Sequence, residues 1–367
     1  MHSTLLQQQI ALSFLQGIGS IRARLLLSKV PDVSAIFTHS LRDLEYSTGL
    51  SKKILKQMNR EFALQQAEKQ LSFFEKNKVQ SYFIQHPDYP RRLKQCEDAP
   101  TLLFGTGNLD LNPLRSIAVV GTRNATDYGR EICENLISSL VGKNVLVVSG
   151  MAYGIDICVH QLCVKYNVPT IGVLGHGLDR LYPSAHKSTA QKMTATGGLL
   201  TEFLPGTNPD RENFPMRNRI VAGMCDATIV VESKNKGGSL ITADLANDYS
   251  RDVFAVPGCI GQTYSEGCNA LISVSKAHLY RSPEHFLKWM DWGESKKPVK
   301  AQRQLFNSLS EDEKSMMEIL QTEGEQHMDS LALKSKLPIS KTSVVLFQLE
   351  MNGLVKALPG KKYVLVA

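Results

Sequence analysis

The residues best suited to chemistry in this sequence are glycines and cations that follow short apolar runs. Ile117–Val120 is an apolar, β-branched run, and Gly121, Thr122 and Arg123 come directly after it. A glycine lets the backbone approach a ligand closely, and an arginine fork can hold two oxygens of a phosphate. A second glycine, Gly129, and an amphipathic run follow, which predicts a strand, a tight turn and a helix. This arrangement is typical of an anion site, with a phosphate as its ligand.

Other predicted strands end in the same way. Glycine or a polar residue directly follows the apolar runs Val145–Val148, Thr170–Leu174 and Ala227–Val231, and Pro257-Gly258 follows Val253–Val256. Because the carboxyl ends of parallel strands lie along one edge of a sheet, these residues are expected to meet there and wrap an anion with backbone N–H groups. The glycines and hydroxyl residues predicted to form this groove are Gly121, Thr122, Ser149, Gly150, Gly154, Gly175, Gly177, Gly238 and Ser239.

A second kind of candidate lies in the run Asn213–Ile220. It places Phe214 close to Arg217, Asn218 and Arg219. Two arginines and an asparagine beside an aromatic ring suit a sugar-phosphate chain with a base stacked nearby. The alternative is that Phe214 belongs to the core and that the arginines are surface charges.

Several signatures of catalysis are missing from the sequence. It has no GxxxxGK[ST] run, the turn after the first strand lacks GxGxxG, and no HExxH or comparable cluster indicates a metal. Asp156 stands at a predicted helix start, where an acidic side chain is favoured by the helix dipole and commonly acts as a cap. Since no nucleophile–base pair stands out, we predict a binding protein that is not an enzyme and that needs no cofactor and no metal.

The elements that must position these residues form an α/β core. From Ser116 to about Arg281 apolar runs alternate with helical stretches, which predicts a parallel sheet covered by helices on both faces. Residues 1–80 are predicted to be helical, and Gly17-Ile18-Gly19 between two apolar helices resembles the turn of a helix-hairpin-helix. The structural alternative for that turn is a plain connection between packed helices.

The C-terminal part differs in composition. Residues 291–304 are polar and predict a linker, and residues 305–367 predict three helices and a hairpin, with Ser310 and Glu313 placed as a capping box. DNA binding and protein interaction are both open for this segment. The predicted fold class is α/β, with a Rossmann-like parallel sheet core at 81–290, an N-terminal helical (helix-hairpin-helix or SAM-like) domain and a C-terminal winged-helix-like domain.

Composition adds broader limits. The net charge is +7 over 367 residues, which favours a polyanionic partner. Seven scattered cysteines without a CxxC pair indicate reduced thiols. No run of eighteen apolar residues occurs, so we expect a cytoplasmic protein without a membrane partner.

Seven motifs, in order, resemble those of a known bacterial family. They are VVGTR from Val119, SGMAYGID from Ser149, GHGLDRLYP from Gly175, FPMRNRI from Phe214, GGSLITA from Gly237, VFAVPG from Val253 and EGCNALI from Glu266. The chain resembles the DNA processing protein A (DprA, also Smf) family, most strongly over residues 82–281. The resemblance implies a non-catalytic protein that binds single-stranded DNA, forms a homodimer through the Rossmann-like domain, and loads the RecA recombinase onto incoming DNA in natural transformation.

The resemblance also implies roles for single residues. Arg123 would be a principal phosphate ligand and Lys236 a second one. Lys187 is the nearest cation after Tyr182-Pro183, where one edge of the groove is less basic than expected. His176 is a departure from the family pattern.

A rival interpretation is enzymatic. Nucleoside-monophosphate phosphoribohydrolases of the cytokinin-activating type use a similar Rossmann-like layout and carry PGGxGTxxE, in which the glutamate performs the hydrolysis. The corresponding stretch here is Lys236–Asp244, which lacks the leading proline, the third glycine and the glutamate. The sequence therefore favours binding, and release of adenine from AMP would support the rival.

Overall fold

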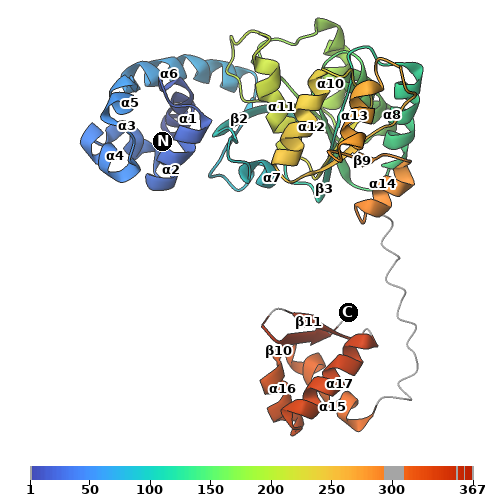
Figure 1. Ribbon diagram of the computed structural model, residues 1–367. Coiled ribbons are helices and arrows are strands. Elements are labelled where there is room, and N and C mark those ends of the chain that lie inside the picture. Colours follow the sequence, from blue (N-terminus) through green and yellow to red (C-terminus); the bar gives the residue numbers. More distant parts are fainter. Residues whose placement is uncertain (1, 293–309, 353, 359, 366–367) are drawn as a thin grey trace. The chain divides into compact units, whose positions relative to one another are not determined.

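The computed structural model describes residues 2–292, 310–352, 354–358 and 360–365 (Figure 1). The chain forms two compact units, residues 1–293 and 294–367, and each is described by itself. The predicted linker, 291–304, lies outside the described residues from 293 onward.

The first unit begins with a bundle of helices that are capped by polar side chains. Asp32, Ser40 and Asn59 each accept a backbone N–H at a helix start. Gly17 has φ +76°, a conformation that suits glycine, and it turns the chain towards the next helix. The elements are α1 (His2–Ala11), a 3₁₀ turn (Leu12–Phe14), α2 (Ser20–Lys29), α3 (Val33–Thr38), α4 (Leu41–Thr48), α5 (Lys52–Gln57) and α6 (Arg60–Lys76).

A nine-stranded sheet forms the centre of this unit, in the order β1-β2-β6-β5-β4-β3-β7-β8-β9. The strands from β3 to β9 pair in parallel, and β2 joins β1 and β6 in antiparallel fashion. The strands are β1 (Gln80–Phe83), β2 (Leu102–Gly107), β3 (Arg115–Val120), β4 (Val145–Ser149), β5 (Thr170–Val173), β6 (Gly198–Thr201), β7 (Ala227–Val230), β8 (Asp252–Ala255) and β9 (His278–Leu279).

The apolar runs of the sequence are explained by burial on both faces of the sheet. In β3, Ile117 and Val119 belong to one hydrophobic cluster, and Ala118 and Val120 belong to another on the opposite face. Successive side chains of a strand point to opposite faces, so a central strand covered twice must be apolar throughout. The prediction of a mostly parallel α/β sheet is confirmed.

Helices cover both faces (Figure 1). Residues of α8, α9 and α14 pack against one face, while residues of α11, α12 and α13 pack against the other. The helices of this part are α7 (Arg91–Lys94), α8 (Asp127–Ser139), α9 (Ile155–Tyr166), α10 (Lys187–Met193), α11 (Asn213–Gly223), α12 (Gly238–Asp248), α13 (Glu266–Ser273) and α14 (Pro283–Trp289), with a 3₁₀ turn at Ser184–His186.

The helical bundle and the sheet share one hydrophobic core. The rings of Phe74 in α6 and Phe104 in β2 are stacked with centroids 4.7 Å apart, and Arg24 of α2 donates to the carbonyl of Cys96. The predicted boundary near residue 80 coincides with the start of β1. The bundle is therefore packed onto the sheet and does not stand as a separate compact unit.

The second unit has the predicted winged-helix elements. It contains α15 (Glu311–Glu323), β10 (Gln326–His327), α16 (Met328–Ser335), α17 (Ile339–Met351), β11 (Val355–Leu358) and β12 (Lys362–Leu365). Its sheet has the order β10-β12-β11. The capping box is confirmed, since Ser310 and Glu313 each accept the other's backbone N–H. No helix among the described residues is long and apolar enough to cross a membrane.

Candidate functional site

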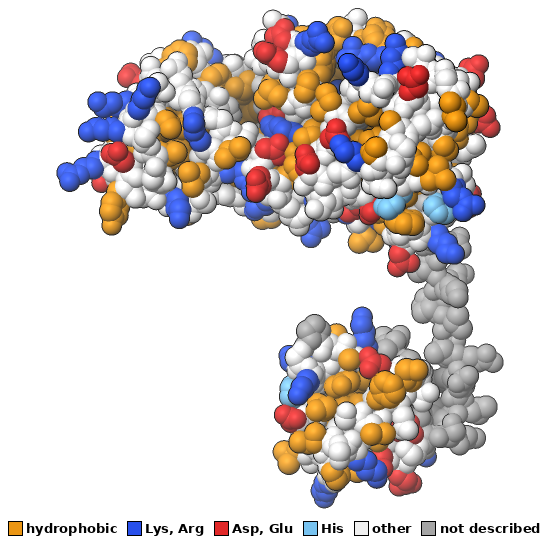
Figure 2. Space-filling view, in the orientation of Figure 1, with side chains coloured by type: hydrophobic (Ala, Val, Ile, Leu, Met, Phe, Trp, Pro, Cys, Tyr) orange, Lys and Arg blue, Asp and Glu red, His pale blue; other side chains and the backbone are white. Residues whose placement is uncertain are grey.

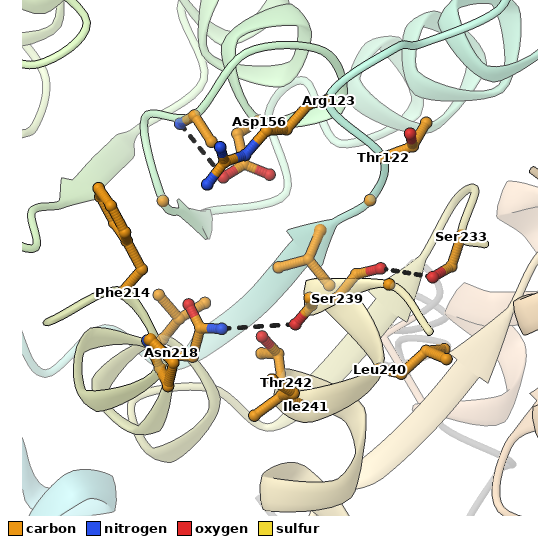
Figure 3. Close-up of a pocket in the computed structure, with 18 of the residues that line it drawn as sticks. Thr122, Arg123, Asp156, Phe214, Asn218, Ser233, Ser239, Leu240, Ile241 and Thr242 are labelled. Atoms are coloured by element: carbon orange, nitrogen blue, oxygen red, sulfur yellow. Dashed lines mark hydrogen bonds between the residues drawn. The ribbon is translucent and has the colours of Figure 1, made fainter. Parts of the chain in front are cut away.

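A cavity of about 1050 Å³ opens at the carboxyl edge of the parallel sheet (Figure 3). Its wall is made by the turn after β3, the loop after β4, the start of α11, and the loop between β7 and α12. Figure 3 shows Arg123 above the open space, Phe214 and Asn218 from α11 at its left, and Ser239 below. Of the residues predicted from the sequence, the wall contains Gly121, Thr122, Arg123, Gly150, Phe214, Arg217, Asn218, Lys236, Gly238 and Ser239.

The turn that carries Arg123 is held by backbone contacts to its neighbours. The Thr122 N–H donates to the carbonyl of Glu232 (2.7 Å), and the Thr122 carbonyl accepts from the N–H of Ile155 (3.1 Å). Gly154 has φ +80°, and a Cβ there would lie 2.1 Å from the Thr122 carbonyl oxygen. The loop before α9 can therefore press against this turn only because residue 154 is glycine.

Arg123 itself is exposed and is placed over an aromatic ring. Its guanidinium carbon lies 5.7 Å from the centroid of Phe214, within the range of a cation–π contact. Among the described residues it has no ion-pair partner. A cation with free donors beside an aromatic face can hold a phosphate while a base stacks on the ring.

A buried carboxylate organises the helix that follows this turn. Glu232, 4% exposed, accepts hydrogen bonds from the backbone N–H (3.0 Å) and the hydroxyl (2.5 Å) of Thr126, the cap of α8. A Cβ on Gly129 would lie 2.3 Å from the Glu232 carboxylate. The second glycine of the opening motif is thus needed for helix packing and lies outside the cavity wall.

The loop from Ser233 to Ser239 forms the opposite wall. The Ser239 hydroxyl donates to the Ser233 hydroxyl (2.9 Å), and the Gly237 N–H donates to the Lys234 carbonyl (3.0 Å). The first turn of α12, from Gly238, lines the cavity without a side-chain cap. Free N–H groups at a helix start attract anions, and the neighbouring Lys234 and Lys236 side chains are exposed.

The electrostatic balance of the wall is positive. Four exposed cations border the cavity: Arg123, Arg211, Lys234 and Lys236. Two carboxylates also line it, but Asp244 is paired with Lys276 (2.8 Å). The other is the buried Asp156. Within the ranges that the structure describes, no cluster of His, Cys, Asp and Glu could hold a metal ion.

Asp156 and Arg217 are buried at the base of the cavity and brace its loops. Asp156 accepts from the N–H of Ala152 (3.3 Å), so it supports the loop before its own helix. Burial raises the pKa of Asp156, and the positive charge of Arg217 opposes that shift. The Arg217 guanidinium donates to the carbonyls of Gly150 and Val173. Both bonds come from Nη1, which therefore ties the ends of β4 and β5 together, and Nε donates to the side chain of Asn218 (3.1 Å).

Arg219 is not brought to the cavity. It forms a buried ion pair with Glu202 and donates to the carbonyl of Asp98, and it is absent from the wall. The physical reason is the helix: in α11, Phe214, Arg217 and Asn218 share a face at i, i+3 and i+4, whereas Arg219 points the other way. The pattern could have shown this had Asn213–Gly223 been predicted as a helix.

The other predicted residues outside the wall have local roles. The Ser149 hydroxyl donates to the carbonyl of Val119 (2.7 Å). A Cβ on Gly175 would lie 3.0 Å from the Phe214 ring, and one on Gly177 would lie 2.5 Å from the Leu204 carbonyl. Lys187 is exposed at the start of α10. These glycines allow close packing behind the wall.

Sequence reasoning missed two of the cations in the wall. Lys234 is two residues from Lys236 in one loop, and counting cations in that loop would have found it. Arg211 stands between Asp210 and Glu212, so its local sequence looks like a neutral surface turn. Only the fold brings it to the mouth of the cavity.

Two family models match this chain. The model described as DNA recombination-mediator protein A covers residues 80–291, and the DprA winged helix domain covers residues 300–361. The chain belongs to the DNA processing protein A (DprA/Smf) family. The cavity wall of this family member lies wholly within the first match.

Individual relatives agree with this assignment. Protein Smf of Synechocystis sp. is 34% identical over an alignment of 310 residues, and the match covers 76% of this chain and 78% of that protein. The structure of DprA from Streptococcus pneumoniae has a TM-score of 0.64 and 33% identity, and the match covers 78% of this chain and 97% of that one. DprA from Helicobacter pylori, whose structure was described for its single-stranded DNA binding mode, has a TM-score of 0.53 and 25% identity over 58% of this chain and 95% of its own.

Proposed function

We propose that this DprA-family chain binds single-stranded DNA in the cavity at the carboxyl edge of the sheet. The observation that carries the proposal is the pairing of Arg123 with Phe214 (5.7 Å) opposite the uncapped start of α12. One nucleotide presents both a phosphate and a flat base, and this wall offers a partner for each. The binding mode described for the Helicobacter pylori relative supports the same ligand.

The wall supplies donors along the sugar-phosphate chain and few that would select a base. Arg123 and Lys236 hold phosphates by charge, and Lys234 and Arg211 extend the positive border. Gly238 and Ser239 line the same space at the start of α12, where no side chain caps the helix. Arg217 contributes by holding the loop and not by direct contact, because it is buried and its Nη1 donates to two backbone carbonyls. Binding is therefore expected to depend on salt and little on sequence.

The function served by this binding is loading of the RecA recombinase onto incoming DNA in natural transformation. The family description as a recombination mediator supports this part of the proposal. A homodimer through the Rossmann-like domain is supported by the end of the sheet, where Val274 is 63%, Leu279 42% and Trp289 51% exposed beside the last strand, β9. Exposed apolar side chains at a sheet edge favour association with a second copy.

Titration of labelled oligo-dT with the full chain tests the proposal. We expect binding without added nucleotide, and a log–log dependence on salt with a slope of about −0.7 for each phosphate that the protein contacts. Equal affinity for duplex and single strand, or affinity that does not change with salt, contradicts it. Sustained release of adenine from AMP would favour the phosphoribohydrolase, in which Asp244 would have to replace the glutamate of that motif.

A further inference from the structure

Two tyrosines beside the cavity are half-exposed although neither belongs to its wall. Tyr182 is 48% and Tyr153 is 49% exposed. Tyr182 follows the end of β5, and Tyr153 stands in the loop between β4 and α9. Single exposed aromatic residues are common on proteins, but these two stand beside the cavity and each ring has an aromatic neighbour there.

Tyr182 continues the row of groups that begins with Arg123. The Arg123 guanidinium lies over the Phe214 ring, and the centroid of Tyr182 is 6.2 Å from that of Phe214 with 37° between the planes. A base stacked on Phe214 would thus have a second aromatic surface next to it along the strand. Consecutive rings are the platform on which single-stranded nucleic acids stack.

Tyr153 lies on the same rim, between two residues that define the site. The preceding Ala152 lines the cavity, and the following Gly154 packs against the turn of Arg123. Its ring meets the imidazole of His186 edge-on, with centroids 4.9 Å apart. Lys187 is the next residue and is exposed, so a cation accompanies this ring as well.

Buried histidines hold both tyrosines. His176, 1% exposed, accepts the Tyr182 N–H at Nε2 (3.1 Å), while its Nδ1 lies 2.9 Å from the Gly177 carbonyl. His186, 5% exposed, places Nδ1 2.8 Å from the carbonyl of Met151. One buried imidazole thus fixes the backbone beside each exposed ring. A ring that is already held in place loses little conformational entropy when a base stacks on it.

We propose that Tyr182 and Tyr153 form an additional stacking site for nucleobases that lie beyond the nucleotide held in the cavity. The site rests on the proposed binding of single-stranded DNA and lengthens the stretch of DNA that the protein contacts. The strand leaves the cavity past Phe214 and crosses the rim towards Lys187. A strand long enough to reach the tyrosines binds more tightly than one that fills the cavity alone. Figure 2 shows Lys and Arg side chains gathered along the upper edge of the large unit, near α10.

The test compares two lengths of oligo-dT on the full chain, about four and about sixteen nucleotides, which span the range of site sizes found for single-strand grooves of OB-fold proteins. Tyr182→Ala and Tyr153→Ala are each expected to weaken the long oligonucleotide at least about fivefold and to leave the short one unchanged. Tyr182→Phe keeps the ring and should retain wild-type affinity for both lengths. Tyr46→Ala is the matched control, because Tyr46 is 93% exposed on α4 of the helical bundle.

A fluorescent base analogue reports stacking directly. With 2-aminopurine at successive positions of the long strand, quenching at the position over Tyr182 should be lost in Tyr182→Ala and kept in Tyr182→Phe. Equal loss for both lengths would show that the tyrosines only support the cavity and would overturn the proposal, as would unchanged affinity for the long strand. If the wild-type chain binds neither length, the proposed function itself fails, and that result is distinct from a failure of the tyrosine site.

Discussion

Replacing Arg123 and Arg219 separately provides a sharp test of the site, because both arginines looked alike in the sequence and the structure gives them opposite roles. Arg123 is exposed at the cavity mouth, with its guanidinium over Phe214. Arg219 is buried, and its side chain and that of Glu202 are 9% and 11% exposed in their ion pair. Arg123 should therefore matter for binding, and Arg219 for the stability of the fold.

The expected magnitudes follow from this burial. Arg219→Ala leaves Glu202 buried without its cation, and breaking such a pair costs about 3–5 kcal/mol of unfolding free energy. Arg123→Ala removes a cation–π contact at an exposed site, worth about 0.5–1 kcal/mol. Its effect on binding is larger, because a charged hydrogen bond to phosphate contributes about 1–3 kcal/mol, or about five- to 150-fold in the dissociation constant.

Thermal unfolding and an oligo-dT titration on the same preparations separate the two roles. Arg123→Ala should unfold close to the wild-type temperature and bind weakly. Arg219→Ala should unfold at a clearly lower temperature and, at a temperature where it remains folded, bind close to normally. A loss of affinity in folded Arg219→Ala as large as that in Arg123→Ala, or an unchanged isotherm for Arg123→Ala, would contradict these roles.

Three further outcomes are expected. Lys236→Ala and Lys234→Ala should each reduce the slope of log affinity against log salt by about 0.7, because each removes one phosphate contact, whereas Lys143→Ala, outside the cavity, should not. Gly154→Ala should both weaken oligo-dT binding and lower the unfolding temperature, because residue 154 has φ +80° and a Cβ there would lie 2.1 Å from the Thr122 carbonyl oxygen. Gly142→Ala is the control for backbone strain alone, because Gly142 has φ +73° but a Cβ there would meet no atom within 4 Å. Burial lowers the pKa of His160 from 6.5 to about 3. Between these values the unfolded chain binds a proton that the folded chain does not bind, so the free energy of unfolding should fall as the pH drops below about 6.5 towards 3. Urea unfolding should show a smaller loss of stability from pH 7 to pH 5 for His160→Gln than for the wild-type chain.

Much of the core could be predicted from the sequence because burial on two faces leaves a plain signal. A run such as Val145–Val148 has no polar face, and only a strand covered by helices on both sides accommodates that pattern. Strand β9 (His278–Leu279), at the end of the nine-stranded sheet, gave no such signal, since it is two residues long and both residues are exposed. Its place in the sheet depends on pairing with β8, a contact between distant parts of the chain.

The site was predicted less completely, for a different reason. Glycine and a cation at a strand end indicate where a phosphate can approach, and this placed Gly121 and Arg123 in the wall. A glycine that admits a ligand and one that admits another loop look the same in sequence, and Gly154 is of the second kind. For an arginine the ambiguity is greater, because Arg217 donates from Nη1 to two carbonyls that become its neighbours only after folding.

Burial therefore divides the polar residues of this edge into two groups with separate consequences. Asp156, Arg217 and Glu232 are buried and bonded to the backbone of the loops, so their substitution changes where the loops lie. Arg123 and Lys236 are exposed at the ends of those loops, and their donors are free for a ligand within the part of the chain that the structure describes. A sugar-phosphate backbone is suited to such a surface because each contact requires a positive charge in a fixed position and does not require recognition of a base. The buried group fixes the loops, and in the proposed binding mode the exposed group supplies the contacts to phosphate, so substitutions in the two groups are expected to have different effects.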